Sequence, residues 1–230
     1  MDNVHTVTQY AQGLWIIDEG GVRVFLIEGQ DSALLIDLGF GRGDLKAVVE
    51  GLTQKPVKVL LTHADGDHTG AFAQFPCVYM HPADFALLRS SHEGGQLHAV
   101  YDQDVIDLGG ISVSIHYIPG HTPGSIAVLD ETHRVLIAGD SVQQGPTYMF
   151  GAARSVEGLI ISLNALKKLD ARYDVILPSH NRLPEDKTLI DKMIKGLGLL
   201  LQGELPAKQA PEHMQDRCHR YDYEDVSFFY

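Results

Sequence analysis

The sequence predicts an α+β fold in which two β-sheets pack face to face and helices cover their outer surfaces. Short apolar or alternating runs, separated by glycine- and aspartate-rich turns, gather in residues 14–37 and again in residues 105–138, which is typical of β-meanders. Helical patterns follow each group of strands, as in residues 44–53 and 155–169. Because strands come in groups and do not alternate strictly with helices, one sheet-on-sheet core fits best, and a single domain over residues 1–230 is expected.

Each expected element rests on its own local pattern. Apolar runs predict strands over residues 14–17, 22–27, 33–37, 57–61, 78–81, 105–108, 111–118, 125–129, 135–138 and 175–177. One-sided apolar spacing and capping residues predict helices over residues 44–53, 69–74, 82–91, 155–169 and 185–202. Residues 91–103 and 203–219 show no period and are interpreted as loops, residues 143–153 as a glycine- and aromatic-rich loop, and residues 221–230 as a closing strand.

The composition narrows the classes of partner and compartment. A net charge of −12 without a basic run disfavours nucleic acid and anionic membrane surfaces as partners. The two cysteines, Cys77 and Cys218, cannot staple a fold of this size, which favours a reducing compartment. No apolar run approaches the ~20 residues needed to span a bilayer, and residues 1–5 lack a signal-peptide pattern. We therefore expect a cytoplasmic protein that acts on a small molecule.

Residues 60–71 carry a dense group of possible metal ligands. His63, Asp65, Asp67 and His68 fall within six positions, directly after the apolar run of residues 57–61. A fold gains little stability from placing two acids between two histidines, so the pattern indicates a site. The end of a strand is also where α/β sheets generally place their ligands.

Three later segments each place a possible ligand after an apolar strand. His121 lies in a glycine-bracketed turn, Asp140 follows Ala138-Gly139, and His180 follows Pro178-Ser179. A strand fixes the backbone, and a small residue before the ligand allows close approach to a metal.

In this order, His-x-Asp-x-Asp-His at residues 63–68, Gly-His-Thr-Pro-Gly-Ser at 120–125, Ala-Gly-Asp at 138–140 and Pro-Ser-His at 178–180 resemble the motifs of the metallo-β-lactamase-fold hydrolases. The resemblance implies a four-layer αβ/βα sandwich with a dinuclear metal site at one edge of the paired sheets. Carried over by position, it assigns one metal to His63, Asp65 and His121. It assigns the other to Asp67, His68 and His180, with Asp140 bridging the two.

The ligand types explain the chemistry that the resemblance implies. Two divalent cations held by imidazoles and carboxylates lower the pKa of a shared water, and an open position polarises a substrate carbonyl or phosphoryl oxygen. Asp67 is the residue expected to orient the hydroxide, and a metal-bound water or Asp140 is the candidate to protonate the leaving group. The expected reaction is hydrolysis of an ester, thioester, lactone or similar bond. Nucleic acids are disfavoured as substrates by the acidic charge. β-Lactams are disfavoured by the missing secretion signal.

Asp65 departs from the family motif, which has histidine at this position. An aspartate oxygen and the Nδ1 of a histidine lie equally far from Cβ, so Asp65 can reach the same metal. Zinc is the expected metal, but the harder, charged donor admits iron or manganese. Flavodiiron proteins carry glutamate at the matching position, which leaves a diiron oxidoreductase as an alternative. The chain lacks their flavodoxin-like domain and rubredoxin cysteine pairs, so hydrolysis is favoured. A non-catalytic metal-binding relative is the third hypothesis.

The substrate contacts are expected near the metals. Tyr148, Met149 and Phe150 would line an apolar pocket, and Arg154 would pair with a substrate anion. An equally weighted alternative is that this cluster only packs the loop or an oligomer contact. Asn181 would donate to a substrate oxygen or cap the following turn. The aromatic tail, residues 221–230, is compatible with a homodimer contact.

Overall fold

The computed structural model describes residues 4–75 and 77–230 of the chain. Its α-helices in this range are α1 (Leu45–Leu52), α2 (Gly66–Thr69), α3 (Phe85–Ser91), α4 (Val156–Leu166) and α5 (Thr188–Leu201). Short 3₁₀ turns accompany them at η1 (Phe72–Gln74), η2 (Pro82–Asp84), η3 (Lys167–Leu169) and η4 (Glu212–Met214).

The first sheet keeps its strands in sequence order. It contains β1 (Thr6–Ala11), β2 (Leu14–Asp18), β3 (Arg23–Glu28), β4 (Ala33–Ile36), β5 (Val57–Leu60), β6 (Cys77–Met80) and β7 (Gln96–Ala99). The first four strands form an antiparallel meander, whereas β4 to β7 are parallel. The parallel part requires crossovers, and α1 supplies the first, capped at its start by the Asp44 carboxylate.

The second sheet runs in the order β14-β13-β11-β10-β9-β8. Its strands are β8 (Val105–Asp107), β9 (Ser112–Tyr117), β10 (Ile126–Asp130), β11 (Val135–Ile137), β13 (Val175–Leu177) and β14 (Glu185–Asp186). The neighbours β11 and β13 are parallel, with Ile137 opposite Leu177. Residues that follow these two strands therefore leave the sheet at the same edge.

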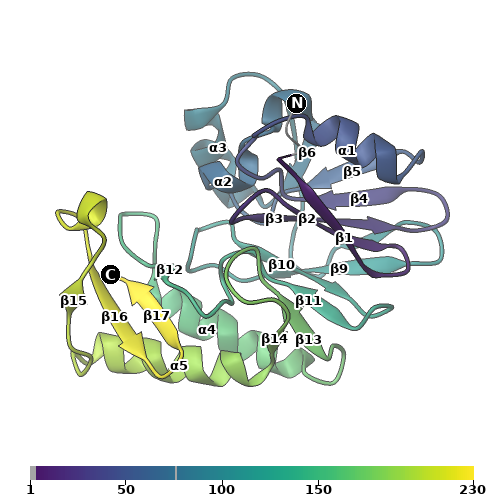
Figure 1. Ribbon diagram of the computed structural model, residues 1–230. Coiled ribbons are helices and arrows are strands. Elements are labelled where there is room, and N and C mark those ends of the chain that lie inside the picture. The colour runs from purple at the N-terminus through teal and green to yellow at the C-terminus, as the bar shows by residue number, and fades with distance from the viewer. Residues whose placement is uncertain (1–3, 76) are drawn as a thin grey trace.

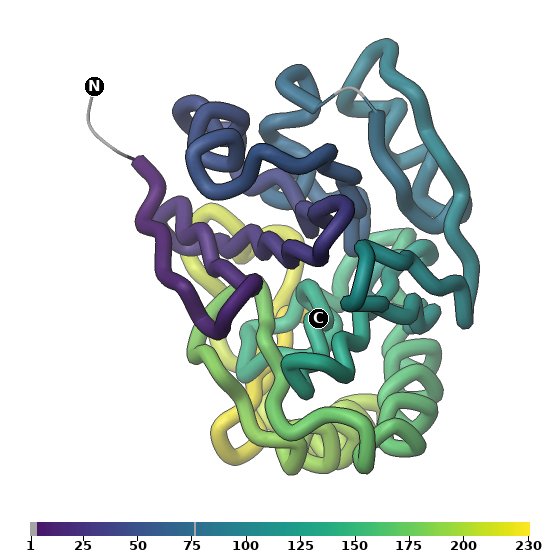
Figure 2. The backbone as a smooth tube through the Cα atoms, turned by 90° about the vertical axis from the view of Figure 1, so that its right-hand side faces the viewer, coloured from purple at the N-terminus to yellow at the C-terminus, as the bar shows by residue number. Residues whose placement is uncertain are grey.

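The two sheets pack face to face between two layers of helices (Figures 1 and 2). Fully buried side chains such as Phe25, Ile36 and Val128 fill the space between the sheets. Helices α1 and α3 cover the first sheet, and α4 and α5 cover the second, at the bottom of both views. This is the α+β four-layer sandwich that the sequence predicted. No helix in the described part of the chain is both long enough and apolar enough to cross a bilayer.

The C-terminal region builds a third, small sheet in place of one closing strand. It pairs β12 (Thr147–Tyr148), β17 (Val226–Phe229), β16 (His219–Tyr223) and β15 (Lys208–Gln209), in that order. The predicted single strand over residues 221–230 is wrong, because the chain turns between β16 and β17 to form a hairpin. The hairpin packs against α5 and holds β12, so the loop that carries Tyr148 is anchored by the end of the chain.

Other local expectations were also wrong. The helix expected over residues 69–74 begins earlier, at Gly66, and stops before η1, so Asp67 and His68 lie on α2. Residues 96–99, expected in a loop, form β7; this edge strand is largely exposed and therefore shows no apolar alternation. The start of the helix expected over residues 185–202 is the short strand β14.

Candidate metal centre

The seven predicted ligands come from four segments that meet at one edge of the paired sheets. Residues 63–68 follow β5, and His121 lies in the turn between β9 and β10. Asp140 and His180 each stand three residues beyond the paired Ile137 and Leu177. Parallel register therefore brings these last two side chains together, although 40 positions separate them in sequence.

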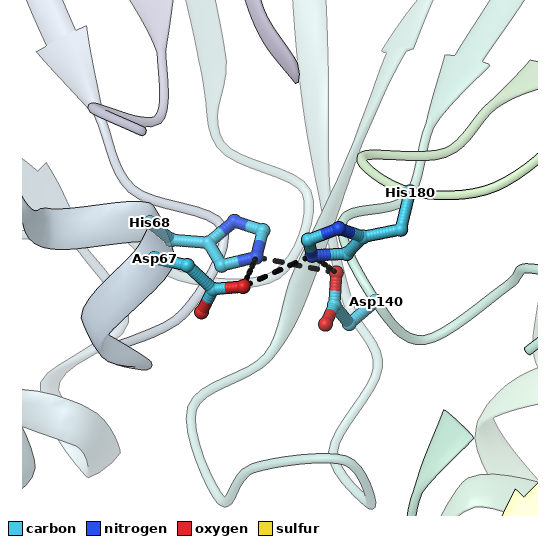
Figure 3. A group of neighbouring side chains, drawn as sticks. All are labelled: Asp67, His68, Asp140 and His180. Atoms are coloured by element: carbon cyan, nitrogen blue, oxygen red, sulfur yellow. Dashed lines mark ion pairs between the residues drawn. The ribbon is translucent and has the colours of Figure 1, made fainter. Parts of the chain in front are cut away.

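One group of side chains consists of Asp67, His68, Asp140 and His180 (Figure 3). The Nε2 atoms of His68 and His180 lie 3.2 and 3.3 Å from Asp140 Oδ1. Asp67 Oδ2 lies 3.1 Å from His180 Nε2 and 3.9 Å from His68 Nε2. One ligand atom of each residue points to a common centre, with all four atoms within 4.8 Å of one another.

A second group, His63, His121 and Asp140, shares the Asp140 carboxylate with the first. His121 Nε2 lies 3.8 Å from Asp140 Oδ2, the oxygen not used by the first group. Asp65 borders this second group, since its Oδ2 lies 3.2 Å from His121 Nε2 and 3.6 Å from His63 Nε2. The structure thus gathers all seven predicted residues and places Asp140 between the two groups.

Each histidine presents Nε2 to the centre and has its Nδ1 held from outside. The outer partners are Thr62 Oγ1 for His63 at 3.0 Å, Asp37 Oδ2 for His68 at 2.7 Å, the Tyr148 carbonyl for His121 at 3.1 Å and the Gly21 carbonyl for His180 at 2.5 Å. Such outer partners fix the orientation of metal-binding imidazoles.

Buried polar atoms without partners test whether these residues fit a cation. His63 Nε2, His68 Nε2 and Asp140 Oδ1 are all buried, and none makes a well-aligned hydrogen bond within residues 4–75 and 77–230, although the last two atoms lie only 3.2 Å apart. Leaving such atoms unpaired costs roughly 1–3 kcal/mol each. Ligands about 2.1 Å from a tetrahedral cation lie about 3.4 Å apart, which agrees with the spacings above. The donor set therefore fits divalent metal ions.

The electrostatics of the cluster also suit cations. Burial alone would raise the pKa of the Asp140 carboxyl, but the imidazoles of His68 and His180 outweigh it and hold this pKa well below its usual range. Burial opposes ionisation of Asp65 as well, yet the imidazoles of His121 and His63 hold the pKa of its carboxyl well below the usual range. The carboxylates are therefore charged at neutral pH. Burial lowers the pKa of His121, which favours the neutral imidazole that binds metal. Burial acts the same way on His68 and His180, but the Asp140 carboxylate outweighs it and raises both pKa values, so metal binding there would release protons.

Two buried aspartates, Asp37 and Asp84, support the ligands, and neither was predicted from the sequence. Asp37 accepts hydrogen bonds from the Thr62 main-chain N–H and hydroxyl, each at 2.7 Å, besides facing His68. Asp84 joins the two ligand loops, because it accepts from the Ala64 N–H and from the Thr122 hydroxyl. Asp37 ends an apolar strand as Asp140 does, and this signal could have identified it; Asp84 looked like a helix start.

The ligand segments approach one another closely through small residues. Gly139 has φ +52°, and a Cβ atom there would lie 2.7 Å from Thr62 Oγ1. A side chain at this position would therefore push the Asp140 loop away from the His63 loop. A main-chain hydrogen bond of 2.9 Å from Ile126 N to the Thr62 carbonyl joins the two sheets at the same place.

A cavity of about 410 Å³ opens over the cluster. Its wall contains Phe40, Asp65, Asp67, Asp140, Gln143, Pro146, Tyr148, His180 and Asn181. A larger cavity, of about 710 Å³, lies beside α1 and β5, and its lining residues belong to neither ligand group. The cavity over the cluster is therefore the candidate substrate site.

The residues predicted to contact substrate divide into two sets. Tyr148 and Asn181 line the cavity, and the Asn181 amide donates to Gln143 Oε1 at 2.7 Å. Phe150 and Arg154 instead line a neighbouring cavity of about 320 Å³ on the other side of Asp65. The Arg154 guanidinium pairs with Asp65 at 2.6 Å, so it does not reach into the candidate substrate site. Met149 is buried in the core beneath α4 and does not line the cavity.

Comparisons with curated proteins give several relatives of modest identity. Acyl-coenzyme A thioesterase MBLAC2 from Gallus gallus is 25% identical over 68% of this chain and 71% of its own. The human protein of that name is 24% identical, and the matched region is 53% of this chain and 58% of the human one. Uncharacterized protein Rv2581c from Mycobacterium tuberculosis is 32% identical over 64% of this chain and 80% of its own.

Solved structures and a family model agree with these sequence matches. A metallo-beta-lactamase from Pontibacter korlensis superposes with a TM-score of 0.72 at 19% identity, covering 84% of this chain and 99% of that one. One from Erythrobacter litoralis has a TM-score of 0.70 at 18% identity, over 86% and 98% of the two chains. The model of the metallo-beta-lactamase superfamily matches residues 17–180, which include all seven predicted ligands. The chain therefore belongs to the metallo-beta-lactamase superfamily.

Proposed function

We propose that this protein is a metal-dependent hydrolase with two divalent cations, and that it cleaves thioesters of small molecules. One observation carries the proposal. Two groups of imidazole nitrogens and carboxylate oxygens converge on Asp140 at the floor of an open cavity. Three of these atoms are buried and make no well-aligned hydrogen bond among the described residues.

The residues would hold the cations as two sets that share Asp140. Asp67, His68 and His180 form one set, and His63 and His121 form the other, with Asp65 beside them. When bound, such cations polarise a carbonyl oxygen and lower the pKa of water. We expect zinc, with iron or manganese as alternatives because Asp65 adds a hard, charged donor.

The side chains around the cavity divide the work of hydrolysis. Water adds to the thioester carbonyl carbon, the C–S bond breaks, and a carboxylic acid and a thiol leave. Asp67 faces the cavity with a side chain that is 28% exposed, so it can accept a hydrogen bond from the attacking water. Asp140 lies deeper, and its carboxylate can accept the proton that the attacking water releases and pass it to the leaving sulfur. Tyr148 and Asn181 form the wall against which the acyl or thiol part of the substrate would lie.

The thioester class is supported by relatives of different origin. Besides the acyl-coenzyme A thioesterases, the atrochrysone carboxyl ACP thioesterase AacuM of Aspergillus aculeatus is 26% identical over 66% of this chain and 47% of its own. The cavity wall combines apolar surface from Phe40, Pro146 and Tyr148 with amides from Gln143 and Asn181. This mixture suits an acyl chain joined to a polar carbonyl group.

The test combines metal analysis with a substrate panel. The full chain, purified without chelators, should contain about two metal ions and release free thiol from acyl-coenzyme A or acyl-N-acetylcysteamine. Esters and lactones complete the panel. Asp140→Asn should lose metal affinity and turnover together. Both losses should exceed the roughly 10–100-fold that is typical when only a hydrogen-bond partner of a metal ligand is removed. Asp174→Asn, at an exposed carboxylate paired with Arg134, is the matched control and should change neither.

Two outcomes would overturn the proposal. A chain that binds no metal in metal-replete buffer would remove the site assignment altogether. Bound iron with oxygen consumption and no hydrolysis would favour the diiron oxidoreductase, which the carboxylate at position 65 keeps as the second candidate.

A further inference from the structure

Arg154 contacts two of the residues around the His63–His121 half of the centre. It precedes α4, and its main-chain N–H donates to the Gly151 carbonyl at 3.2 Å. Its Nη2 donates to Asp65 Oδ2 at 2.6 Å, and its Nη1 donates to the main-chain carbonyl of His121. The side chain is only 14% exposed. The guanidinium is thus held against this half-site from the side of the neighbouring cavity.

The oxygen that Arg154 binds is the one that faces the imidazoles. Asp65 Oδ2 lies 3.2 Å from His121 Nε2 and 3.6 Å from His63 Nε2. These spacings are those of neighbouring ligands around one cation, about 3.4 Å. A carboxylate oxygen has more than one lone pair, so it can accept from the guanidinium and still face a metal.

The charges of the two side chains cancel. An aspartate at a position where the family motif described above has histidine adds one negative charge to the site. Arg154 adds one positive charge beside that carboxylate, in a partly buried place where charges are weakly screened.

We propose that Asp65 and Arg154 form one charge-matched unit, in which Asp65 is a ligand of the His63–His121 cation and Arg154 positions and neutralises it. The inference rests on the proposed metal centre. It assigns Arg154 a positioning role in place of a substrate contact. It also makes the two half-sites unequal, because Asp67, His68, Asp140 and His180 have no arginine or lysine ion-pair partner among the described residues.

A double-mutant cycle tests the unit with metal affinity as the measurement. Zn²⁺ and Co²⁺ are titrated into metal-free full chain against a chromophoric chelator, and the Co²⁺ spectrum reports the ligand set. Asp65→His alone leaves Arg154 uncompensated beside the cation, so the weaker-bound equivalent should lose affinity about 10–100-fold. The double variant Asp65→His/Arg154→Gln removes both charges, so its metal affinity should return to within about threefold of the wild-type value.

Two further variants separate this role from simple structural support. Arg154→Gln alone leaves Asp65 fully charged and should shift preference from Zn²⁺ toward Mn²⁺, whereas Arg154→Lys keeps the charge and should shift it less. Arg134→Gln, which breaks the exposed pair with Asp174, is the control and should change no metal affinity.

The outcomes separate this inference from the proposed function. If wild type binds two equivalents but the double variant is no better than Asp65→His, Arg154 is only a structural support and the inference is wrong. If Asp65→His alone has wild-type affinity, the charges are not coupled and the inference also fails. If wild type binds no metal, the proposed function itself fails. Recovery in the double variant, with a restored Co²⁺ spectrum, supports the unit.

Discussion

The imidazole of His68 shows how single residues prepare the centre. It is fully buried, with Nε2 toward Asp140 at 3.2 Å and Nδ1 toward Asp37 at 2.7 Å. Burial alone would lower its pKa, but these two carboxylates outweigh burial and raise the pKa well above the usual value. Asp37 therefore controls both the orientation and the proton of a predicted ligand.

Asp37→Asn tests that control. Asp37 has φ +66°, which asparagine tolerates, so the backbone should stay in place. The amide offers one acceptor where the carboxylate serves Thr62 and His68, so metal affinity should fall about 10–100-fold. The measurement is competition with a chelator of known affinity.

Asp130→Asn is the matched control for Asp37→Asn. Asp130 is also fully buried and also holds a histidine, His133, at 2.5 Å. It lies at the end of β10 remote from the centre, so the control should lose stability without losing metal affinity. Equal metal affinities in the Asp37 variant and wild type would contradict the assigned role of Asp37.

At the scale of elements, strand β14 contains a buried acidic residue, Glu185, whose burial destabilises the charged form of its carboxyl group. The Glu185 side chain has a buried Oε1 without a hydrogen-bond partner in the described residues. Burial raises the pKa of this carboxyl, and Arg182 only partly offsets the effect. A raised pKa in the folded state means that Glu185 favours folding below its unfolded pKa and loses that contribution as pH rises through the folded pKa.

Glu185→Gln should therefore stabilise the protein at pH 7 and change little at pH 4. Glutamine keeps a polar atom in the same buried place, so the gain comes from removing the buried charge and is expected to be roughly 1 kcal/mol. Denaturant midpoints at the two pH values provide the measurement. Asp186→Asn is a neighbouring control, because a hydrogen bond from Thr188 lowers the pKa of that exposed carboxyl, so no gain is expected at pH 7. A Glu185→Gln gain that is the same at both pH values would refute the explanation.

At the scale of the whole molecule, the centre lies where the two sheets meet. Its ligands follow strands of both sheets, and main-chain hydrogen bonds join the segments there, as from Ser179 N to the Gly139 carbonyl at 3.2 Å. Cations bound only by the folded state stabilise it by mass action, by about 4 kcal/mol at 1,000 times Kd.

Removal of metal should therefore lower the melting temperature, by about 10 °C for a chain of this size. Calorimetry or circular dichroism before and after treatment with a chelator measures the change, and added Zn²⁺ should restore it. Asp140→Asn should melt at the same temperature with and without chelator. A wild-type protein equally insensitive to chelator would show that cations do not link the two sheets.

The sequence by itself determined the strand groups, the α+β class and the order of ligand motifs. Burial of one or both faces of a strand leaves a local pattern of apolar residues, and His63, Asp140 and His180 follow such strands directly. Asp65 was likewise visible as an unusual member of its motif. These features are local, so no knowledge of the chain's path was needed to find them.

Only the tertiary structure decided which distant residues meet. Arg154 lies 89 positions from Asp65, and their pairing depends on how the loop before α4 returns to the end of β5. The small C-terminal sheet was not predicted because its strands β12, β15 and β16 are short or partly exposed, so their sequences show no apolar alternation. The physical reason is the same in both cases: local burial leaves a pattern in the sequence, whereas a contact between remote segments leaves none.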